Sequence, residues 1–488
     1  MKVKNLIILI IFFISIFFST LIINKYDKYE VSSDTRINHT LIKADILRFY
    51  KEADYIKKKF ESGSSLSELG QFYYSSYLPP KIIALYYILI SEDFFLYKND
   101  TEGNNDWKKD ASRRDFTINS IYADSEGNLF DPFNGKEVRV KKDNNKITFI
   151  YFQISIFFLS ILYFYKILKK NIGKTSMIIF LFLIIEPTIH QFNYSFYSES
   201  IFFSLNIFLI AQIIKGSNNK SNAFFIGLLV GILYLQRSIA IFYFIPILIF
   251  FILERKKLNY IFTYLSGIFL IILFLGTHNY FRAGVIQITP YQSKADLYYF
   301  MIPNILKKKE NKIAVSDLSI MKEKIDLFKI QNNSNLTKEK DLLIYGNYVR
   351  NLSVQYLLNN PLQTIQVMIQ KTAHALNFNP FEIYSFYKYE YKPVDHKLRY
   401  YKSSEHQKFL VVRIIYSIII YSICLLGFLM MLKKKELLNI QIFLTLSILY
   451  YIVLGGWHGN PRYLSSNIIF LSVFFGFGFL KLKEIVKL

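Results

Sequence analysis

Three arginines at the ends of separate apolar segments could bind an anion at a membrane surface. Arg237, Arg282 and Arg462 lie on the side that the lysine distribution described below assigns to the outside. Arginine is disfavoured there, so each residue calls for a partner. A guanidinium group can bind two phosphate oxygens at once; the alternative is that the side chain merely extends to the membrane surface. We therefore predict phosphate binding by these arginines, with Tyr463 beside Arg462.

Acidic residues near the same side could accept a proton. Asp45 lies in ADILRFYKEA, and a carboxylate there could take the proton of an acceptor hydroxyl while cations hold a departing phosphate. The alternative is a helical pair with Arg48. Asp34 is the reserve candidate. Glu199 begins an apolar run and is a candidate substrate-binding residue, or else an ordinary acidic residue at a helix N-terminus.

These side chains are separated by long apolar runs, which predict an all-α integral membrane protein. The 488 residues are 52% hydrophobic and only 19% charged. Runs of span length indicate about ten transmembrane helices. They fall near 5–23, 147–166, 175–191, 198–214, 222–236, 238–253, 258–277, 408–432, 437–454 and 464–481.

Lysine-containing loops predict the orientation of these spans. Such loops occur at 166–174, 215–220, 254–257, 432–436 and 481–488, all on the side of the N-terminus, whereas the loops at 190–199 and 455–463 hold few or none. By the positive-inside rule the N-terminus is cytoplasmic and the chain is a multi-pass protein of the cytoplasmic membrane. The first run is long for a signal peptide, so we expect an uncleaved anchor.

This orientation divides the chain into five predicted regions, two of them long and extracytoplasmic. Both long segments contain amphipathic helical patterns, at 43–62 and 360–376, and such helices are expected on or near the outer membrane face. The regions are the anchor 1–23, the outer segment 24–146, the transmembrane bundle 147–277, the outer segment 278–407 and the C-terminal spans 408–488.

The net charge of +23 would fit nucleic-acid binding, but its distribution does not favour that partner. Lysines gather in short tracts beside apolar runs, which is the pattern of a topology signal. The single cysteine, Cys424, excludes an intramolecular disulfide and a cysteine-based metal site. We expect membrane lipids as partners and no nucleic acid.

One stretch of the first outer segment has a different character. Residues 106–135 read DWKKDASRRDFTINSIYADSEGNLFDPFNG, which resembles part of the head domain of tRNA nucleotidyltransferases and bacterial poly(A) polymerases. In that family RRDFTIN helps bind the nucleotide, and preceding Gly-Gly and Asp-x-Asp motifs serve the metal-dependent chemistry. Here no Gly-Gly precedes the stretch and no Asp-x-Asp occurs in the chain. We interpret 101–138 as an insert without this activity, in a loop that tolerates it.

The rest of the chain resembles the polytopic glycosyltransferases of the GT-C superfamily, which includes protein O-mannosyltransferases and the lipid A aminoarabinose transferase. The resemblance rests on the order of short motifs: ADILRFYKEA (44–53), YLPPKIIALYY (77–87), EPTIHQFNYSFYSESIFF (186–203), LQRSIAIF (235–242), THNYFRAG (277–284) and GNPRYL (459–464). It implies transfer of a sugar from a polyprenyl-phosphate carrier to a lipid, glycan or protein acceptor, outside the membrane. It further implies that Asp45, with Ala53 eight residues on, is the base and that Arg462–Tyr463 binds phosphate.

Two other functions remain open at this point. A non-enzymatic transporter of lipid-linked saccharides would place polar residues within its spans and use broken helices near the midplane. The apolar interiors of the spans favour the enzyme over this alternative. A tRNA nucleotidyltransferase or poly(A) polymerase is the third function. Some GT-C enzymes also use a divalent metal ion, but the sequence identifies no ligands for one; no other cofactor is expected.

Overall fold

The computed structural model describes most of the predicted bundle 147–277 and of the C-terminal spans, and parts of the rest. The described residues are 53, 56–57, 78–89, 122–123, 129–130, 144–193, 198–216, 219–284, 286–289, 297–306, 308, 311–331, 339–376, 390–394, 397–401, 404–458 and 461–486. The predicted first span, Asp34 and Asp45 lie outside them. The side chain of Arg282 is likewise outside the description, although its backbone belongs to a helix.

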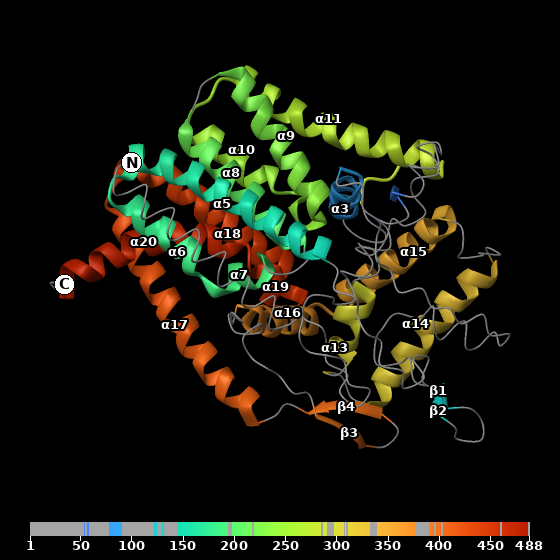
Figure 1. Ribbon diagram of the computed structural model, residues 1–488. Coiled ribbons are helices and arrows are strands. Elements are labelled where there is room, and N and C mark those ends of the chain that lie inside the picture. Colours follow the sequence, from blue (N-terminus) through green and yellow to red (C-terminus); the bar gives the residue numbers. More distant parts are fainter. Residues whose placement is uncertain are drawn as a thin grey trace.

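Most of the described residues form a bundle of apolar helices around one core (Figure 1). The core is built largely from aromatic and branched aliphatic side chains, because the helices are apolar on more than one face. The helices are α5 (Asn144–Ile172), α6 (Thr175–Ile185), α7 (Pro187–Asn193), α8 (Ser198–Lys215), α9 (Lys220–Gln236), α10 (Phe244–Leu253), α11 (Leu258–Ala283), α17 (Ser404–Leu432), α18 (Leu438–Gly455) and α20 (Asn467–Val486).

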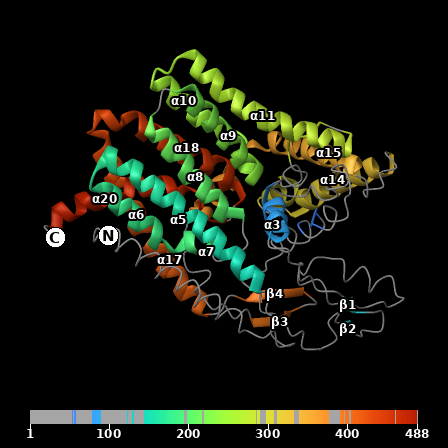
Figure 2. The same cartoon turned by 45° about the horizontal axis from the view of Figure 1, so that its top comes forward.

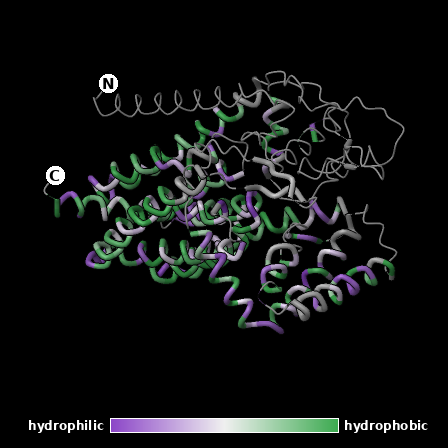
Figure 3. Tube along the Cα trace, turned by 90° about the horizontal axis from the view of Figure 1, so that it is seen from below, coloured by the Kyte–Doolittle hydropathy of each residue, from purple (hydrophilic) through white to green (hydrophobic). Residues whose placement is uncertain are grey.

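Five helices in the described part of the chain are long and apolar enough to cross a membrane. They cover Phe149–Ile172, Ser198–Lys215, Leu258–Phe281, Ile414–Leu432 and Lys435–His458. Shorter apolar helices correspond to the predicted spans 175–191, 222–236 and 238–253. The C-terminal part of α20 contains Lys481, Lys483 and Glu484, so the apolar part of this helix is shorter than the helix itself. Figure 3 shows hydrophobic positions dominating the bundle.

The predicted span 175–191 is wrong as a single helix. Glu186 has ψ 116, an extended conformation, between α6 and α7. Proline disfavours helical geometry at the residue before it, and Pro187 can begin a new helix because the first turn needs no bond from its nitrogen. Glu186 then accepts hydrogen bonds from the backbone N–H of Ile189 (2.9 Å) and from the Tyr416 hydroxyl (2.8 Å). The break is thus fixed by a buried carboxylate.

Two helix pairs pack through glycines at close range. A Cβ on Gly427 in α17 would lie 1.7 Å from the Phe474 carbonyl oxygen, and one on Gly478 in α20 would lie 1.9 Å from the Ile423 oxygen. The pair α9 and α11 meets in the same way at Gly227 and Gly267. Small residues at such crossings let helix backbones approach closely, a common device of membrane helices.

The predicted outer segment 278–407 contains helices and one hairpin. In two views, α14 and α15 lie to one side of the bundle, away from α20 (Figures 1 and 2). Small apolar clusters around Met301 and Ile302 join these helices. The elements are a π turn (η4, Leu297–Met301), α13 (Ile302–Leu306), α14 (Asn311–Gln331), α15 (Glu339–Leu358), α16 (Pro361–Ala375), β3 (Glu390–Val394) and β4 (Lys397–Tyr401).

The described elements are almost entirely helical, as predicted, and the hairpin β3–β4 is the main exception. Its antiparallel register pairs Tyr391 with Tyr400 and Lys392 with Arg399. Aromatic residues favour strands over helices, which accounts for a hairpin in this tyrosine-rich stretch. A second short ladder pairs β1 (Tyr122–Ala123) with β2 (Leu129–Phe130).

Part of the predicted first outer segment packs on the bundle. α3 (Leu78–Leu89) contributes Ile83 and Ala84 to the main core, and its Tyr86 ring lies 5.1 Å from the ring of Phe149 in α5. Ala53 is also fully buried in this core. These contacts bring a piece of the segment that contains Asp45 against the bundle.

Candidate functional site

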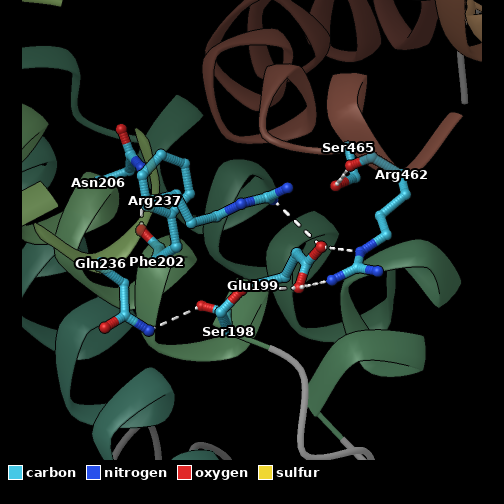
Figure 4. A network of polar contacts seen from close by, with 8 residues as sticks. All are labelled: Ser198, Glu199, Phe202, Asn206, Gln236, Arg237, Arg462 and Ser465. Atoms are coloured by element: carbon cyan, nitrogen blue, oxygen red, sulfur yellow. Dashed lines mark hydrogen bonds and ion pairs between the residues drawn. The ribbon is translucent and has the colours of Figure 1, made fainter. Parts of the chain in front are cut away.

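A fully buried carboxylate holds two arginines from distant parts of the chain (Figure 4). Glu199, at the start of α8, accepts a hydrogen bond from Nε of Arg462, and Nη2 of Arg462 lies 3.2 Å from Glu199 Oε2. Nη1 of Arg237 lies 3.2 Å from Glu199 Oε1. The Arg237 side chain is 7% exposed and that of Arg462 is 20% exposed. A bidentate pair of this kind fixes the plane of a guanidinium group.

Helix ends place all three side chains. Glu199 lies in the first turn of α8, where the helix dipole favours a negative charge. Arg237 follows α9 in an extended conformation, with φ −147, and precedes a 3-10 turn at Ser238–Ala240. The neighbouring Gln236 donates to the Ser198 carbonyl oxygen at 3.0 Å and so ties the end of α9 to the start of α8.

Arg462 lies on the short helix α19 (Pro461–Leu464), between α18 and α20. Proline begins this helix, a position that it favours. The Ser465 hydroxyl donates to the Arg462 carbonyl oxygen at 2.6 Å, which helps to turn the chain into α20. Residues 461–464 of the GNPRYL motif thus form a short helix that presents Arg462.

Aromatic rings enclose the Arg237 guanidinium. Its central carbon lies 5.6 Å from the ring centres of both Phe202 and Tyr463. Tyr463 stacks on His458 at 4.2 Å, and His458 lies 3.9 Å from Trp457. Cation–π contacts of this kind gain strength where water is excluded. Tyr463 therefore forms part of the wall around the arginines.

A third cation comes from the predicted outer segment. Lys371 of α16 and Arg237 both act electrostatically on His458. α16 packs tightly on the turn η6 (Gly456–His458), because a Cβ on Gly456 would lie 2.5 Å from Thr372 Oγ1. Arg237 and Arg462 thus pair with Glu199, while Lys371 of the predicted outer segment lies close enough to act on the adjacent His458.

One donor at this cluster lacks a hydrogen bond despite its ion pair. Arg237 Nη1 is close enough to Glu199 for charge attraction, yet its geometry satisfies no hydrogen bond within the described residues. The two observations agree if the angle rather than the distance is unfavourable. A buried donor without an acceptor is costly. An anion entering the cluster could supply that acceptor.

The structure thus brings together four of the predicted site residues: Glu199, Arg237, Arg462 and Tyr463. Sequence reasoning missed Lys371, although a signal was present. Lys371 follows Val367 by four residues and precedes Ala375 by four, so it shares a helix face with two buried side chains. A lysine on the buried face of an amphipathic helix is unusual, and this position could have identified Lys371 as a candidate.

No group of three or more His, Cys, Asp or Glu side chains is placed to hold a metal ion in the part of the chain that the structure describes. The structure therefore assigns no ligands to the divalent ion that the GT-C resemblance allows.

Comparison with known proteins finds matches within the predicted first outer segment. Residues 83–142 match the family described as the Poly A polymerase head domain. The human mitochondrial CCA tRNA nucleotidyltransferase 1 is 47% identical over 51 residues, which are 10% of this chain and 11% of that protein. The mouse protein is 45% identical over the same length. This chain thus spans about a tenth of the curated relatives that it matches. No solved structure matches.

These matches support the predicted nucleotidyltransferase-like insert and extend it. The family match begins at Ile83, inside α3, whereas the sequence predicted an insert at 101–138. The ladder β1–β2 lies within the matched range. α3 contributes to the core of the apolar bundle, so the first part of the matched range packs with the bundle.

Proposed function

We propose that this protein is a membrane glycosyltransferase of the GT-C type, which moves a sugar from a polyprenyl-phosphate carrier to an acceptor at the outer face of the cytoplasmic membrane. The observation that carries the proposal is the buried cluster of Glu199, Arg237 and Arg462. Buried arginines at the ends of apolar helices suit a lipid-linked phosphate, because guanidinium groups match phosphate oxygens and the carrier reaches them from the bilayer.

The arginines of the cluster suit the charge that develops in this reaction. When the acceptor oxygen bonds to the anomeric carbon, the bond from that carbon to the phosphate oxygen breaks. The phosphate then changes from a diester with one negative charge to a monoester that approaches two, since its second pKa is about 6. Arg237 and Arg462 would offer cationic hydrogen-bond donors to that phosphate oxygen, so they would stabilise the product phosphate and the transition state that leads to it.

Glu199 has a positioning role in this proposal rather than that of a base. Its two oxygens are already engaged by guanidinium groups. The acceptor proton would pass instead to the carboxylate of Asp45, in the outer segment whose residue Ala53 is buried against the bundle. Asp34 is the reserve base. Arg282, at the end of α11, is an additional phosphate ligand in the proposal.

The membrane part of the proposal comprises about ten spans with a cytoplasmic N-terminus. Large apolar side chains project from the outside of the bundle, for example Phe262, Phe269 and Leu273 on α11. Such exposure suits contact with lipid. Asn439 donates to Glu254 (2.7 Å) and Lys434 lies 5.2 Å from the Phe477 ring, so the lysine-containing loops at 254–257 and 432–436 lie at the same end of the bundle.

The test uses purified protein with a synthetic polyprenyl-phosphate sugar. Asp45→Asn should abolish transfer while carrier binding stays near the parent value, because a positioned base contributes about 10²–10⁴-fold in rate. Arg462→Ala and Lys371→Ala should weaken carrier binding first. Asp34→Asn is the matched control for Asp45→Asn. If Asp34→Asn alone abolishes transfer, the base is wrongly assigned; parent rates in both variants would refute the mechanism.

A nucleotidyltransferase is the second candidate, favoured by the match at residues 83–142. The absence of an Asp-x-Asp pair argues against it, since two carboxylates must hold the metal ions of nucleotidyl transfer. A transporter of lipid-linked saccharides is the third candidate. Binding of the carrier without transfer of its sugar to any acceptor would favour the transporter.

A further inference from the structure

Helix α16 presents an apolar stripe on the face opposite to the one that packs on the protein. Val367 and Ala375 are buried, and Val367 packs with Met301 and Ile305. On the other face, Leu362 is 71% exposed, Ile365 54% and Ile369 65%. These three residues fall at helical spacing on one side. An amphipathic helix that is apolar on its outer face needs a further partner.

The depth of α16 relative to a candidate span identifies that partner. The Tyr421 hydroxyl of α17 donates to the Leu376 carbonyl oxygen, directly after the end of α16, at 2.8 Å. Tyr421 lies seven residues (421 − 414) inside the candidate span Ile414–Leu432, which is about 10 Å along a helix. Interfacial helices bury their apolar faces about 5–10 Å into the boundary between headgroups and acyl chains. The end of α16 is therefore at interfacial depth.

Side chains close to the end of α16 also suit contact with lipid. Ile414, Ile415 and Ile418, on the same half of α17, are exposed, as expected for side chains that face lipid. Trp457 packs against the cluster beneath α16, and tryptophan is enriched at membrane interfaces. Lipid is thus the occupant that suits the stripe.

We propose that α16 lies in the outer membrane interface, with Leu362, Ile365 and Ile369 inserted among the lipids and Lys371 held above the buried arginines. This inference rests on the membrane location that the proposed function assumes, but not on sugar transfer. It gives the lipid carrier a defined entry point, because the same helix contacts acyl chains on one face and the site on the other.

The test uses fluorescent labels at single cysteines in the full-length protein, reconstituted in phosphatidylcholine and phosphatidylglycerol vesicles. Cys424, which is buried, is first replaced by alanine. Ile365→Cys and Ile369→Cys are then made in that background, with Gln370→Cys as a control on an adjacent exposed position of the same helix. Leu362→Cys provides a second variant of the stripe. Each label is exposed to doxyl lipids in the bilayer and to iodide in water.

We expect doxyl lipids to quench the labels at Ile365 and Ile369 and iodide to lose its effect there, relative to Gln370. Equal quenching by iodide at all positions would overturn the inference, because the stripe would then face water. Protection from both quenchers would also overturn it, since protein would cover the stripe. Sugar transfer by the unlabelled Cys424→Ala protein is measured separately. Lipid quenching without transfer would refute the proposed function and leave this inference intact.

Discussion

Glu199 compensates the charges of the two buried arginines, Arg237 and Arg462. It is fully buried and pairs with both Arg237 and Arg462. Removing one partner of a buried pair leaves the remaining charges without compensation, which typically costs 3–5 kcal/mol, roughly. Glu199→Gln keeps the shape of the side chain and removes its charge. It should lower the free energy of unfolding by about that amount.

Thermal unfolding in detergent measures this effect, with Glu254→Gln as the control. Glu254 also accepts a hydrogen bond, from Asn439, but it is exposed at the other end of the bundle. Removing the charge of Glu254 should therefore change the stability of the protein little. Combining Glu199→Gln with Arg462→Gln should cost less than the sum of the single changes, because the two residues interact directly. Equal, small effects at both glutamates would show that the ion pairs contribute nothing.

For single residues, the sequence predicted which charged side chains belong to the site but not which of them pair with one another. Glu199, Arg237 and Arg462 stood out because each is a charged residue at the end of an apolar run. Residues 263 positions apart in the chain, such as Glu199 and Arg462, meet only through tertiary packing. Single-residue reasoning therefore assigned Glu199 to the substrate, whereas its observed partners are the arginines.

Helix existence was predictable from apolar runs, but helix ends and breaks were not. Nine of the ten predicted spans coincide with described helical segments, because long apolar stretches need internal backbone hydrogen bonds. The break at Glu186 was missed, since a hydropathy pattern carries no information about one proline within an apolar run. The strands of β3–β4 were missed because aromatic residues occur in both helices and strands of this chain.

The glycine crossing of α17 and α20 gives a prediction at the scale of elements. Gly427→Ala would place a Cβ 1.7 Å from a backbone oxygen of α20, so the helices must move apart. We expect a destabilisation of roughly 1–3 kcal/mol, the usual cost of overpacking, measured by thermal unfolding in detergent. Gly276→Ala is the matched control, since its Cβ would have 3.4 Å to its nearest neighbour.

The sign of the control makes this comparison decisive. Alanine is intrinsically better than glycine in a helix by about 1 kcal/mol, so Gly276→Ala should be neutral or slightly stabilising. If Gly427→Ala behaves in the same way, α17 and α20 do not cross at these glycines.

At the scale of the whole molecule, the lysine-containing loops predict a single orientation. Reporter fusions at Asn134 and Lys434 should report opposite compartments, because lysine-rich short loops stay in the cytoplasm. The contacts of Glu254 with Asn439 and of Lys434 with Phe477 already gather such loops at one end. A fusion at Lys256 serves as the matched control and should agree with Lys434. Agreement between Asn134 and Lys434 would contradict the orientation.

The nucleotidyltransferase-like range is the other property of the whole chain that experiment can decide. Its family match covers residues 83–142, yet Ile83 and Ala84 belong to the bundle core. Deleting 101–138 removes most of the match and leaves α3 in place. We expect the shortened protein to insert and fold, because polar loop insertions are tolerated where few packed contacts cross them. Its thermal unfolding in detergent should stay near that of the parent.

A larger deletion, 83–138, is the matched comparison and should destabilise the protein. It removes the Tyr86–Phe149 ring contact and two core side chains along with the insert. The intact protein should also fail to extend a tRNA 3′ end with ATP and magnesium, since the sequence lacks the paired aspartates that hold catalytic metal ions. Extension by the intact protein, lost on deletion of 101–138, would establish the nucleotidyltransferase and reject the insert as a passive loop.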